Sequence, residues 1–436
     1  MMKKKLKLFF KKSLIYLSSN ILNASIPFIL LPIFSYYLST DDYGRIAMFQ
    51  ILITGLNAII GLNTVGAASR RYFDNDKSHV LVNYNNSSFI ILFLSALITV
   101  VAVIIFSKIL VDFLSIPLSW IYLAVFCSAG NYIIQFRLVQ FQIRQRALAY
   151  GVLQVSNSFF NFILSLILII YIDMGVYGRV IAVSLSALFF TIYCLYSLKK
   201  EKLISFQFKK LNFIKDNLSF GIPLIPHVIG VFFLSSIDRF IINKKFGLSE
   251  AGIYMMAFQV SLALVLIYDS INKAFVPFLF SILSNENKND DIKNKIIYSS
   301  YFLFLLCVLT GAIAYFISPY ILVFISSEKY ISATSFIGFL CVGQSFQGLY
   351  LIVTNYIFFM KKTKLLSLVT IVSGIVNIIL IVLLIEDYGL LGVSISFCIS
   401  MMIRFLLTWY LAQRIYPMPW NVFKLMKKNK TCTRQH

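Results

Sequence analysis

The sequence has few charged residues and almost no histidine. Charged residues make up 13% of the chain, against roughly 25% in soluble domains. The three His residues lie far apart, and none of the six Cys forms a CxxC pair. These deficits exclude an ordinary soluble domain and argue against a metal site or a disulfide framework. The pattern GxxxxGK[ST] does not occur, so no ATP-binding loop is predicted.

Long apolar runs are what the chain has in abundance. Hydrophobic residues make up 59% of it, and the mean hydropathy is +0.84. The runs match helices of about 20 residues that cross a bilayer. The first run continues to about Leu38 without a cleavage site, so we expect an uncleaved span. The predicted fold is an all-α polytopic membrane protein with twelve spans, at 14–38, 46–68, 88–107, 117–137, 151–172, 176–198, 218–243, 252–280, 296–317, 331–360, 365–385 and 388–412.

The basic residues between the spans predict the topology. The two termini and five alternate loops carry 30 of the 39 Lys and Arg residues, whereas the other six loops carry six. Loops rich in Lys and Arg stay in the cytoplasm, so both termini are predicted to be cytoplasmic. The net charge of +22 then reflects topology and contact with anionic lipids of the bilayer, and no nucleic-acid partner is expected.

An internal repeat divides the chain. The stretch "YLSTDDYGRIAMFQ" at 37–50 resembles "FGLSEAGIYMMAFQ" at 246–259, and Gly44 and Gly252 are 208 residues apart. Each half has six predicted spans, which indicates parallel repeats arranged as two six-helix bundles around a central cavity, a transporter plan. The predicted domains are an N-terminal bundle, a basic cytoplasmic linker, a C-terminal bundle and a cytoplasmic tail, at 1–198, 199–217, 218–414 and 415–436.

Several segments carry a family resemblance. They are "IPFILLPIFSYYLSTDDYG", "GLNTVGAASRRYF", "QIRQRALAYGVLQVSNSFFNFILSLILI" and "FGIPLIPHVIGVFFLSSIDRFIINKKFGLSEAGIYMMAF". The last contains Pro-Leu-Ile-Pro, Ser-x-x-Asp-Arg and Gly-x-Tyr at the family's spacing. In these features the chain resembles polysaccharide repeat-unit flippases, the Wzx type, of the multidrug/oligosaccharidyl-lipid/polysaccharide exporter superfamily.

The resemblance implies both a fold and a function. It implies a V-shaped twelve-helix bundle in the inner membrane that moves undecaprenyl-diphosphate-linked oligosaccharides from the cytoplasmic to the periplasmic leaflet by alternating access. The product would be O-antigen or another surface polysaccharide, and the polymerase and chain-length regulator of that pathway would be partners. The resemblance implies a transporter that is not an enzyme and has no cofactor, with coupling to H⁺ or Na⁺ as an open alternative.

Charges inside the predicted spans are the first candidate site residues. Arg404 lies deep in the last span, with no acidic residue on that helix, so it should face a cavity or a neighbouring acid. A role in substrate binding or gating and a structural ion pair remain alternatives for it. Asp269 and Lys273 are four residues apart and share a helix face. They form either a structural pair or a functional site, in which Asp269 couples to an ion and Lys273 lines the cavity.

A second set of candidates lies near the predicted ends of spans. Asp238 and Arg239 interrupt the run "FFLSSIDRFII". Consecutive helical residues point about 100° apart, so we expect that they do not neutralise each other and that Asp238 pairs with the other half as an outer gate. At predicted cytoplasmic ends, the candidates either anchor the topology or first contact the diphosphate: Arg70, Arg71 and Arg137. Amides within spans either line the cavity or join helices: Asn57, Gln154, Asn157, Asn161, Gln259, Gln344 and Gln347.

Two other functions compete with the flippase. An ion-coupled drug antiporter of the same superfamily would share the architecture but export cations, and the net charge of +22 and Arg404 favour an anionic substrate instead. A membrane glycosyltransferase or polymerase would need large outer loops with catalytic acids. The predicted outer loops are short, so we reject this second alternative.

Overall fold

The computed structural model describes residues 2–74, 78–205, 213–283, 290–360, 362–418 and 420, and within them all regular structure is helical. Among these residues ten helices are long and apolar enough to cross a membrane, and a bent pair of helices adds an eleventh span. The last and longest of the ten leaves helical geometry at Gly389 (φ 55°, ψ −135°), so it counts as two spans. The twelve predicted spans and the all-α polytopic fold class are therefore confirmed.

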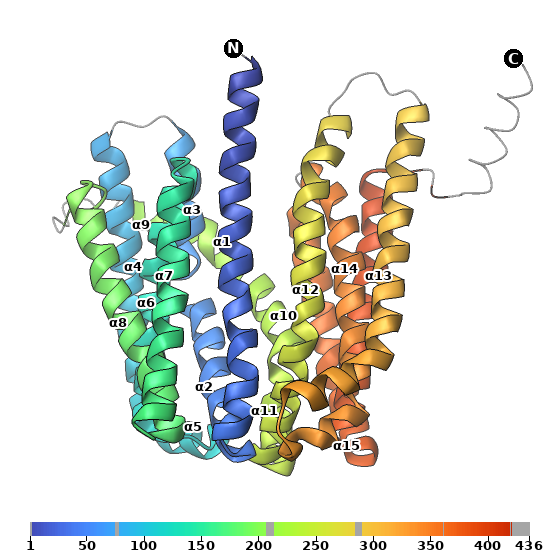
Figure 1. Ribbon diagram of the computed structural model, residues 1–436. Coiled ribbons are helices and arrows are strands. Elements are labelled where there is room, and N and C mark those ends of the chain that lie inside the picture. Colours follow the sequence, from blue (N-terminus) through green and yellow to red (C-terminus); the bar gives the residue numbers. More distant parts are fainter. Residues whose placement is uncertain are drawn as a thin grey trace, which may run out of the picture. The chain divides into compact units, whose positions relative to one another are not determined.

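The helices divide between two compact units, one of residues 1–256 and 323–333 and one of residues 257–322 and 334–436. Figure 1 shows their course. Up to residue 200 they are α1 (Met2–Tyr37), α2 (Thr40–Ile59), α3 (Thr64–Arg71), η1 (Tyr72–Asp74), α4 (Ser78–Ile105), α5 (Ser107–Leu114), α6 (Leu118–Ile143), α7 (Ala147–Leu166), the π-helical η2 (Ile167–Tyr171) and α8 (Gly175–Lys200). After the loop they are α9 (Phe213–Gly221), η3 (Ile222–Leu224), α10 (Ile225–Ser235), α11 (Ile237–Phe246), α12 (Leu248–Leu283), α13 (Asp290–Ile325), η4 (Glu328–Ser335), α14 (Ile337–Phe359) and α15 (Thr363–Ile415).

The first unit is built from helices that pack lengthwise. Helix α1 lies along α7, α6 lies between α2 and α8, and α9 packs on α3 and α4. Small residues allow close approach, as membrane helices require because lipid provides no hydrophobic drive between them. A Cβ atom added at Gly130 of α6 would lie 2.6 Å from Oγ1 of Thr191 in α8. Small residues therefore set the spacing between helices in this unit.

The second unit has a core of aromatic and aliphatic side chains. Helices α12, α13, α14 and α15 contribute to it, with Tyr268, Phe304, Tyr356 and Phe405 among its buried members. Trp420, beyond the end of α15, stacks on Phe304 at a centroid distance of 6.0 Å. The chain after α15 therefore folds back onto the unit that it follows.

The second predicted span is broken near its middle. Helices α2 and α3 meet at a 48° bend, where Gly61, Leu62 and Asn63 all have positive φ. Such a break frees backbone groups that hydrocarbon cannot satisfy. The N–H of Gly61 donates to Oγ of Ser95 at 2.9 Å, so α4 supplies the missing partner.

The two copies of the sequence repeat pack against each other at one end of the first unit. A Cβ atom added at Gly44 would lie 2.0 Å from the carbonyl oxygen of Leu248, and one added at Gly252 would lie 2.1 Å from that of Thr40. Thr40 and Leu248 are also 208 residues apart, so the contact is reciprocal, as in a two-fold symmetric interface. The hydroxyl of Ser249 donates to Thr40 Oγ1 at 2.7 Å. We call this contact between α2 and α12 the glycine crossing.

Other predicted outer loops meet around the glycine crossing. Asn243 Nδ2 donates to Ser115 Oγ at 3.2 Å, and the hydroxyl of Ser327 donates to the carbonyl of Ser35 at 2.7 Å. Because the second half of the sequence packs here on the first, residues 213–256 and 323–333 fall within the first compact unit. The contact-based division therefore differs from the predicted bundles at 1–198 and 218–414, which remain a prediction about the repeat.

We expect Gly44→Ala and Gly252→Ala each to destabilise the protein. The added methyl group would meet a backbone carbonyl that cannot rotate away, and overpacking of this kind costs about 1–3 kcal/mol. Gly55→Ala is the matched control, because its Cβ would meet only the edge of the Phe232 ring, at 3.3 Å. Thermal unfolding of the purified variants in detergent measures the difference. Equal unfolding temperatures for Gly44→Ala and Gly55→Ala would contradict the close approach at the crossing.

Candidate functional site

Arg404 is the buried cation of the second unit. Its side chain, on α15, is only 6% exposed. The guanidinium lies 3.8 Å above the ring of Tyr350, and Nη1 donates to Oε1 of Gln347 at 2.7 Å. Both partners are neutral and both lie on α14. Among the described residues no carboxylate forms an ion pair with Arg404, and its Nε has no hydrogen-bond partner.

Asp269 and Lys273 form an ion pair on α12. Lys273 Nζ lies 2.5 Å from Asp269 Oδ2, and the two side chains are 44% and 42% exposed. The predicted i, i+4 pair is therefore present. Exposed ion pairs contribute little to stability. Because both side chains are partly exposed, a ligand or an ion can reach them. Roles for Asp269 in ion coupling and for Lys273 in a cavity remain predictions.

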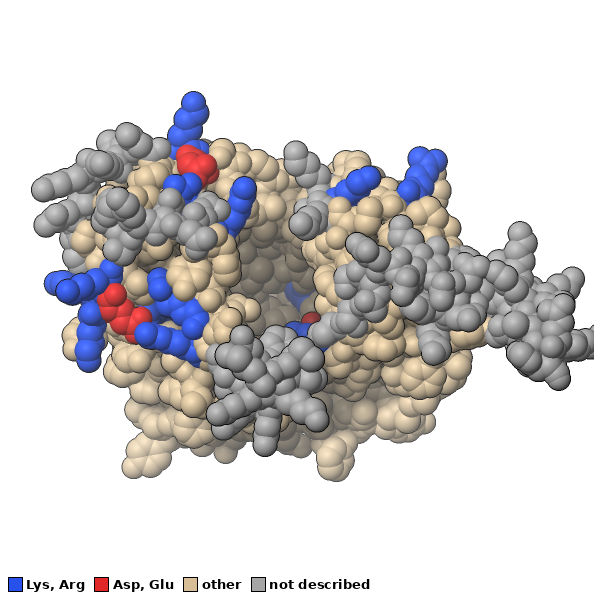
Figure 2. Space-filling model, turned by 90° about the horizontal axis from the view of Figure 1, so that it is seen from above, with Lys and Arg blue, Asp and Glu red and all other residues tan. Residues whose placement is uncertain are grey.

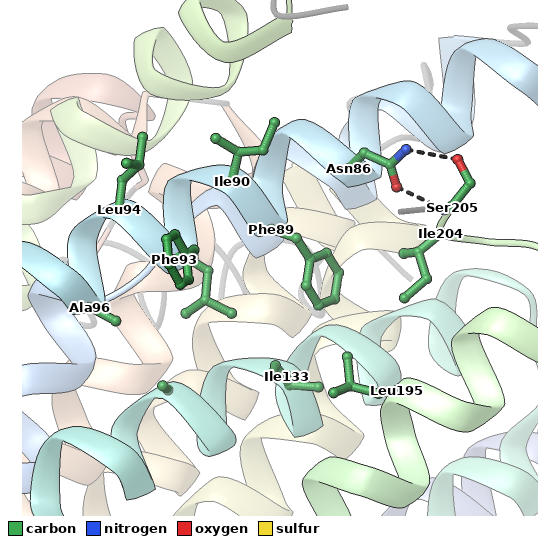
Figure 3. Close-up of a pocket in the computed structure, with 12 residues that line it drawn as sticks. Asn86, Phe89, Ile90, Phe93, Leu94, Ala96, Ile133, Leu195, Ile204 and Ser205 are labelled. Carbon is green, nitrogen blue, oxygen red and sulfur yellow. Dashed lines mark hydrogen bonds between the residues drawn. The ribbon is translucent and has the colours of Figure 1, made fainter. Parts of the chain in front are cut away.

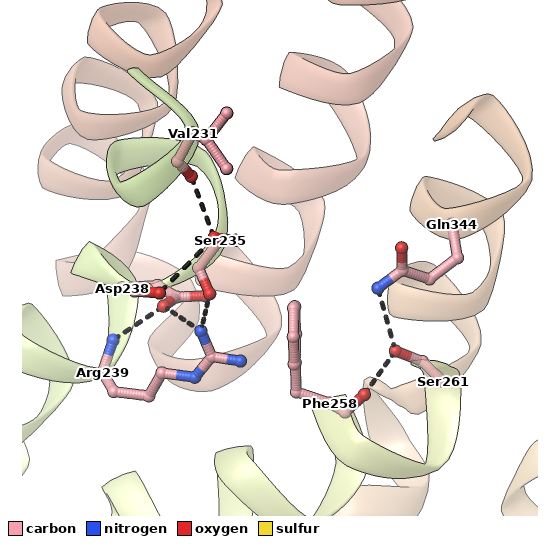
Figure 4. A network of polar contacts seen from close by, with 8 residues as sticks. Val231, Ser235, Asp238, Arg239, Phe258, Ser261 and Gln344 are labelled. Carbon is pink, nitrogen blue, oxygen red and sulfur yellow. Dashed lines mark hydrogen bonds and ion pairs between the residues drawn. The ribbon is translucent and has the colours of Figure 1, made fainter. Parts of the chain in front are cut away.

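Asp238 and Arg239 do neutralise each other, so the expectation that they cannot was wrong. Arg239 Nη1 lies 2.9 Å from Asp238 Oδ1, and both residues are almost fully buried. The helix breaks at Ser236, whose φ is −143°, and Asp238 therefore lies in the first turn of α11. Arg239 folds back to donate to the carbonyl of Ser235, the last residue of α10, as Figure 4 shows. Their role as a gate stays a prediction.

Figure 4 also shows a polar link inside the second unit. Gln344 Nε2 on α14 donates to Ser261 Oγ on α12 at 3.3 Å. Gln344 is buried, and it lies one helical turn from Gln347, the partner of Arg404. These amides were predicted either to line a cavity or to join helices; Gln344 joins helices, and Gln347 holds the cation.

Basic side chains gather on the first unit at the end where α8 finishes, as Figure 2 shows. Two of the predicted site residues lie there on aromatic rings. The guanidinium of Arg70 is 6.0 Å from the ring centroid of Phe220, and that of Arg71 is 5.6 Å from that of Tyr84. Arg70 is exposed and Arg71 half-buried, so this end presents positive charge at a helix terminus, where an anionic group can reach it.

Arg137 belongs to a different kind of structure. Its side chain is fully buried, and Nη2 donates to Glu201 Oε1 at 2.6 Å and to Ser197 Oγ at 2.7 Å. Arg146 donates to the same carboxylate oxygen at 2.7 Å. Glu201 therefore ties α6 and the start of α7 to the end of α8. This arrangement uses Arg137 as a structural tie, and a substrate contact for it remains a prediction.

Glu201 is held ionised by these neighbours. Burial alone would raise its pKa, but the hydrogen bonds and charges of Arg137 and Arg146 outweigh burial and lower the pKa below the usual 4.5. A carboxylate with a lowered pKa stabilises the fold at pH values above the unfolded pKa. This contribution is lost as the pH falls through the lowered value.

Arg179 is a half-buried cation that sequence reasoning missed, because it was counted among the loop residues. It lies on α8, and Nη1 donates to Asn161 Oδ1 and to Ser165 Oγ, both at 2.6 Å. Its guanidinium is 5.3 Å from the ring centroid of Phe34. The sequence did contain a signal for this site: Asn161 and Ser165 are polar residues one helical turn apart on a predicted span, and they are the two acceptors of Arg179. Arg179 resembles Arg404 in having neutral partners.

Within the described residues, the cations thus divide into two classes. Arg137, Arg239 and Lys273 are paired with carboxylates, whereas Arg404 and Arg179 are held by amides, hydroxyls and rings. No three His, Cys, Asp or Glu side chains gather as a metal ion would need in the part of the chain that the structure describes. The second class offers positive charge that no carboxylate neutralises.

Comparison with known proteins places the chain in a family. A family model described as "Polysaccharide biosynthesis protein" matches residues 9–283, more than half of the chain. The chain belongs to this polysaccharide biosynthesis family. A Haemophilus influenzae relative named "Lsg locus putative protein 1" is 27% identical over 377 residues, which cover 85% of this chain and 89% of the relative. A Shigella flexneri relative named "Putative O-antigen transporter" is 28% identical over 179 residues, 41% of this chain and 42% of the relative.

Solved structures agree on the fold. An inward-facing multidrug resistance MATE family transporter of the MOP superfamily superposes with a TM-score of 0.69 at 17% identity, covering 92% of this chain and 98% of its own. A mutant Vibrio cholerae MATE transporter gives a TM-score of 0.64 at 15% identity, with 94% and 96% covered. The fold predicted from the resemblance to the exporter superfamily is therefore confirmed. Both solved structures are named as transporters, and a second Haemophilus influenzae relative is named as a membrane protein.

We expect Glu201→Gln to destabilise the protein by about 3 kcal/mol, because it leaves Arg137 buried without a counter-charge. Arg146→Gln is the matched control: it removes the other cation from the same carboxylate, but Arg146 is 52% exposed, so the cost should stay below about 1 kcal/mol. Thermal unfolding in detergent at neutral pH compares the two variants. If Arg146→Gln proved as damaging as Glu201→Gln, the buried tie would not be the origin of the stability.

Proposed function

We propose that the protein is a flippase for lipid-linked oligosaccharides. It would move undecaprenyl-diphosphate-linked repeat units from the cytoplasmic to the periplasmic leaflet of the inner membrane by alternating access, for O-antigen or another surface polysaccharide. The family and the Shigella flexneri relative support a polysaccharide substrate. The observation that carries the proposal is Arg404, a buried guanidinium whose partners are all neutral.

The energetics of Arg404 favour an anionic ligand. A charge at the centre of a membrane costs about 2.5–3.5 kcal/mol on insertion scales. A structural cation offsets this cost with a carboxylate, as Arg239 does with Asp238. Arg404 instead keeps its donors for a transient partner, since the Gln347 amide and the Tyr350 ring orient the guanidinium without neutralising it. A guanidinium binds phosphate oxygens in a bidentate manner, which suits a diphosphate.

The neighbours of Arg404 also suit the oligosaccharide part of the substrate. Tyr350 and Gln347 are one helical turn apart on α14. An aromatic ring and an amide offer a stacking surface and hydrogen bonds, as a sugar requires. Arg70 and Arg71, at the predicted cytoplasmic end of the first unit, would first attract the diphosphate.

The second candidate is an ion-coupled drug antiporter, favoured by the MATE fold and by Asp269. The carboxylate of Asp269 is 42% exposed and could take up a proton or hold Na⁺. However, Lys273 neutralises it, whereas an exporter of cations would use an uncompensated acid. The flippase remains the better reading of the charges, and H⁺ or Na⁺ coupling through Asp269 is compatible with it.

We expect Arg404→Ala to abolish flipping while the protein still folds. In a host strain lacking the gene, undecaprenyl-diphosphate-linked repeat units should accumulate in the inner leaflet. The wild-type gene should restore them to the outer leaflet, and Arg404→Ala should fail to do so, because the diphosphate loses its buried counter-charge. Leaflet location is measured by accessibility of the glycan in intact and lysed spheroplasts.

Arg414→Ala is the matched control for this experiment. Arg414 lies on the same helix and also stacks on a tyrosine, 4.7 Å from the ring centroid of Tyr410, but it is exposed. If both Arg414→Ala and Arg404→Ala restored flipping, the protein would still be a flippase, but Arg404 would not be part of its substrate site. Unchanged surface glycan in the deletion strain, together with altered drug tolerance, would replace the flippase by the antiporter.

A further inference from the structure

The first unit contains an apolar cavity that the proposed transport does not use. It has a volume of about 610 Å³ and lies among α4, α6 and α8, as Figure 3 shows. This volume falls within the range of about 300–1,000 Å³ that ligand sites occupy. The walls are hydrocarbon: Phe89 and Phe93 of α4 face Ile133 of α6 and Leu195 of α8. Phe93 is 68% exposed, so the cavity opens to the membrane as a groove.

One end of the groove is polar and built of fixed groups. Asn86 Nδ2 donates to Ser205 Oγ at 3.0 Å, and the N–H of Ser205 donates to Asn86 Oδ1 at 2.9 Å. Asn85 Nδ2 donates to the carbonyl of Leu203 at 2.8 Å. The segment 203–205, which follows α8, is thereby attached across the start of the groove. The groove is therefore amphiphilic along its length, with a polar head and an apolar body.

The length of the groove matches a single leaflet. Its wall on α4 runs from Asn86 to Ala96, which at 1.5 Å per residue is about 15 Å. The hydrocarbon core of a bilayer is about 30 Å thick, so one leaflet contributes about half of that. A chain of the length of one phospholipid tail fills such a groove. A polyprenyl chain that must change leaflets with its head group is a poorer match, because this wall of the groove ends after about 15 Å, half the thickness of the hydrocarbon core.

The charge at the polar end favours an anionic head group. Lys200 and Lys202 are exposed directly before the segment 203–205. Glu201, which lies between them, is occupied by Arg137 and Arg146, so it does not neutralise the two lysines. A lysine near a bilayer surface contributes attraction to anionic lipids. The groove thus presents positive charge, then fixed polar groups, then an apolar channel. A phospholipid has the matching order of anionic head group, polar glycerol esters and acyl chain.

We propose that this groove binds one acyl chain of an anionic phospholipid from the leaflet that meets the end of α8, with the head group on Lys200 and Lys202. The bound lipid acts as a resident partner of the first unit and fills the space between α4, α6 and α8. The proposal does not depend on the transported substrate, because the groove faces lipid and shares no residue with the Arg404 site.

Native mass spectrometry of the full-length protein tests the proposal. After exchange into detergent with a mixture of phosphatidylglycerol and phosphatidylcholine, we expect one phosphatidylglycerol per chain, retained at least about tenfold better than phosphatidylcholine. Ala96→Trp, which fills the groove, should abolish retention, and the double variant Lys200→Gln/Lys202→Gln should remove the preference. The matched controls are Val101→Trp, an exposed position further along α4, and Lys244→Gln/Lys245→Gln at the end of α11.

Three results would overturn the proposal. They are equal retention of the two phospholipids by the wild type, unchanged retention in Ala96→Trp, and displacement of phosphatidylglycerol by undecaprenyl phosphate at equal concentration. The last would assign the groove to the substrate's chain. If Ala96→Trp does not fold, the double lysine variant decides the test, because it changes only exposed side chains. Lipid retention does not require transport, so its outcome is independent of the flippase assay.

Discussion

Hydrocarbon offers neither hydrogen-bond partners nor counter-charges, and this constraint governs the structure of the protein. It forces the backbone into helices. Wherever a helix breaks, the freed backbone N–H and C=O groups need hydrogen-bond partners from elsewhere in the protein. At the break between α2 and α3, Ser95 of a neighbouring helix accepts the hydrogen bond of the Gly61 N–H. At the break between α10 and α11, Arg239 donates to the free carbonyl of Ser235. The broken spans thus depend on polar side chains brought in from nearby.

The same constraint explains how the buried charges are paired. A buried cation normally has a carboxylate, and Arg137 and Arg239 each have one. Arg404 departs from this rule more fully than the half-buried Arg179, since it is 6% exposed and its neutral partners orient it but leave its charge uncompensated. A departure from a costly rule is where function is expected. In a family of polysaccharide biosynthesis proteins with a transporter fold, the anionic lipid-linked glycan that we propose as substrate would account for that departure.

The glycine crossing shows what the sequence repeat does in the fold. Two equivalent positions, Gly44 and Gly252, let α2 and α12 approach each other until backbone meets backbone. A contact of this kind places few side-chain atoms between the two helices, so the backbone geometry alone fixes their distance. The Asp238–Arg239 pair lies in α11, directly before α12. The pair has no net charge, and at the crossing itself the hydroxyl of Ser249 donates to Thr40 Oγ1.

How much the sequence predicts depends on whether the signal is local. Hydropathy, the distribution of Lys and Arg and the repeat around Gly44 and Gly252 are local patterns. The all-α class and the twelve spans could be predicted from these patterns, because a helix in lipid forms its backbone hydrogen bonds within its own segment. The Asp238–Arg239 pair was missed because no local sequence pattern predicts the helix break at Ser236, which brings the two side chains together.

Hydropathy and composition were enough to predict the spans, their number and the charged residues within them. Which of these charged residues are neutralised depends on the packing of the helices. Glu201 reaches Arg137 across 64 residues, and Asn161 meets Arg179 from another helix. The groove beside Asn86 likewise exists only because three helices and the segment after α8 surround it. Burial and pairing depend on neighbours distant in the chain, and a hydropathy pattern carries no information about which neighbours those are.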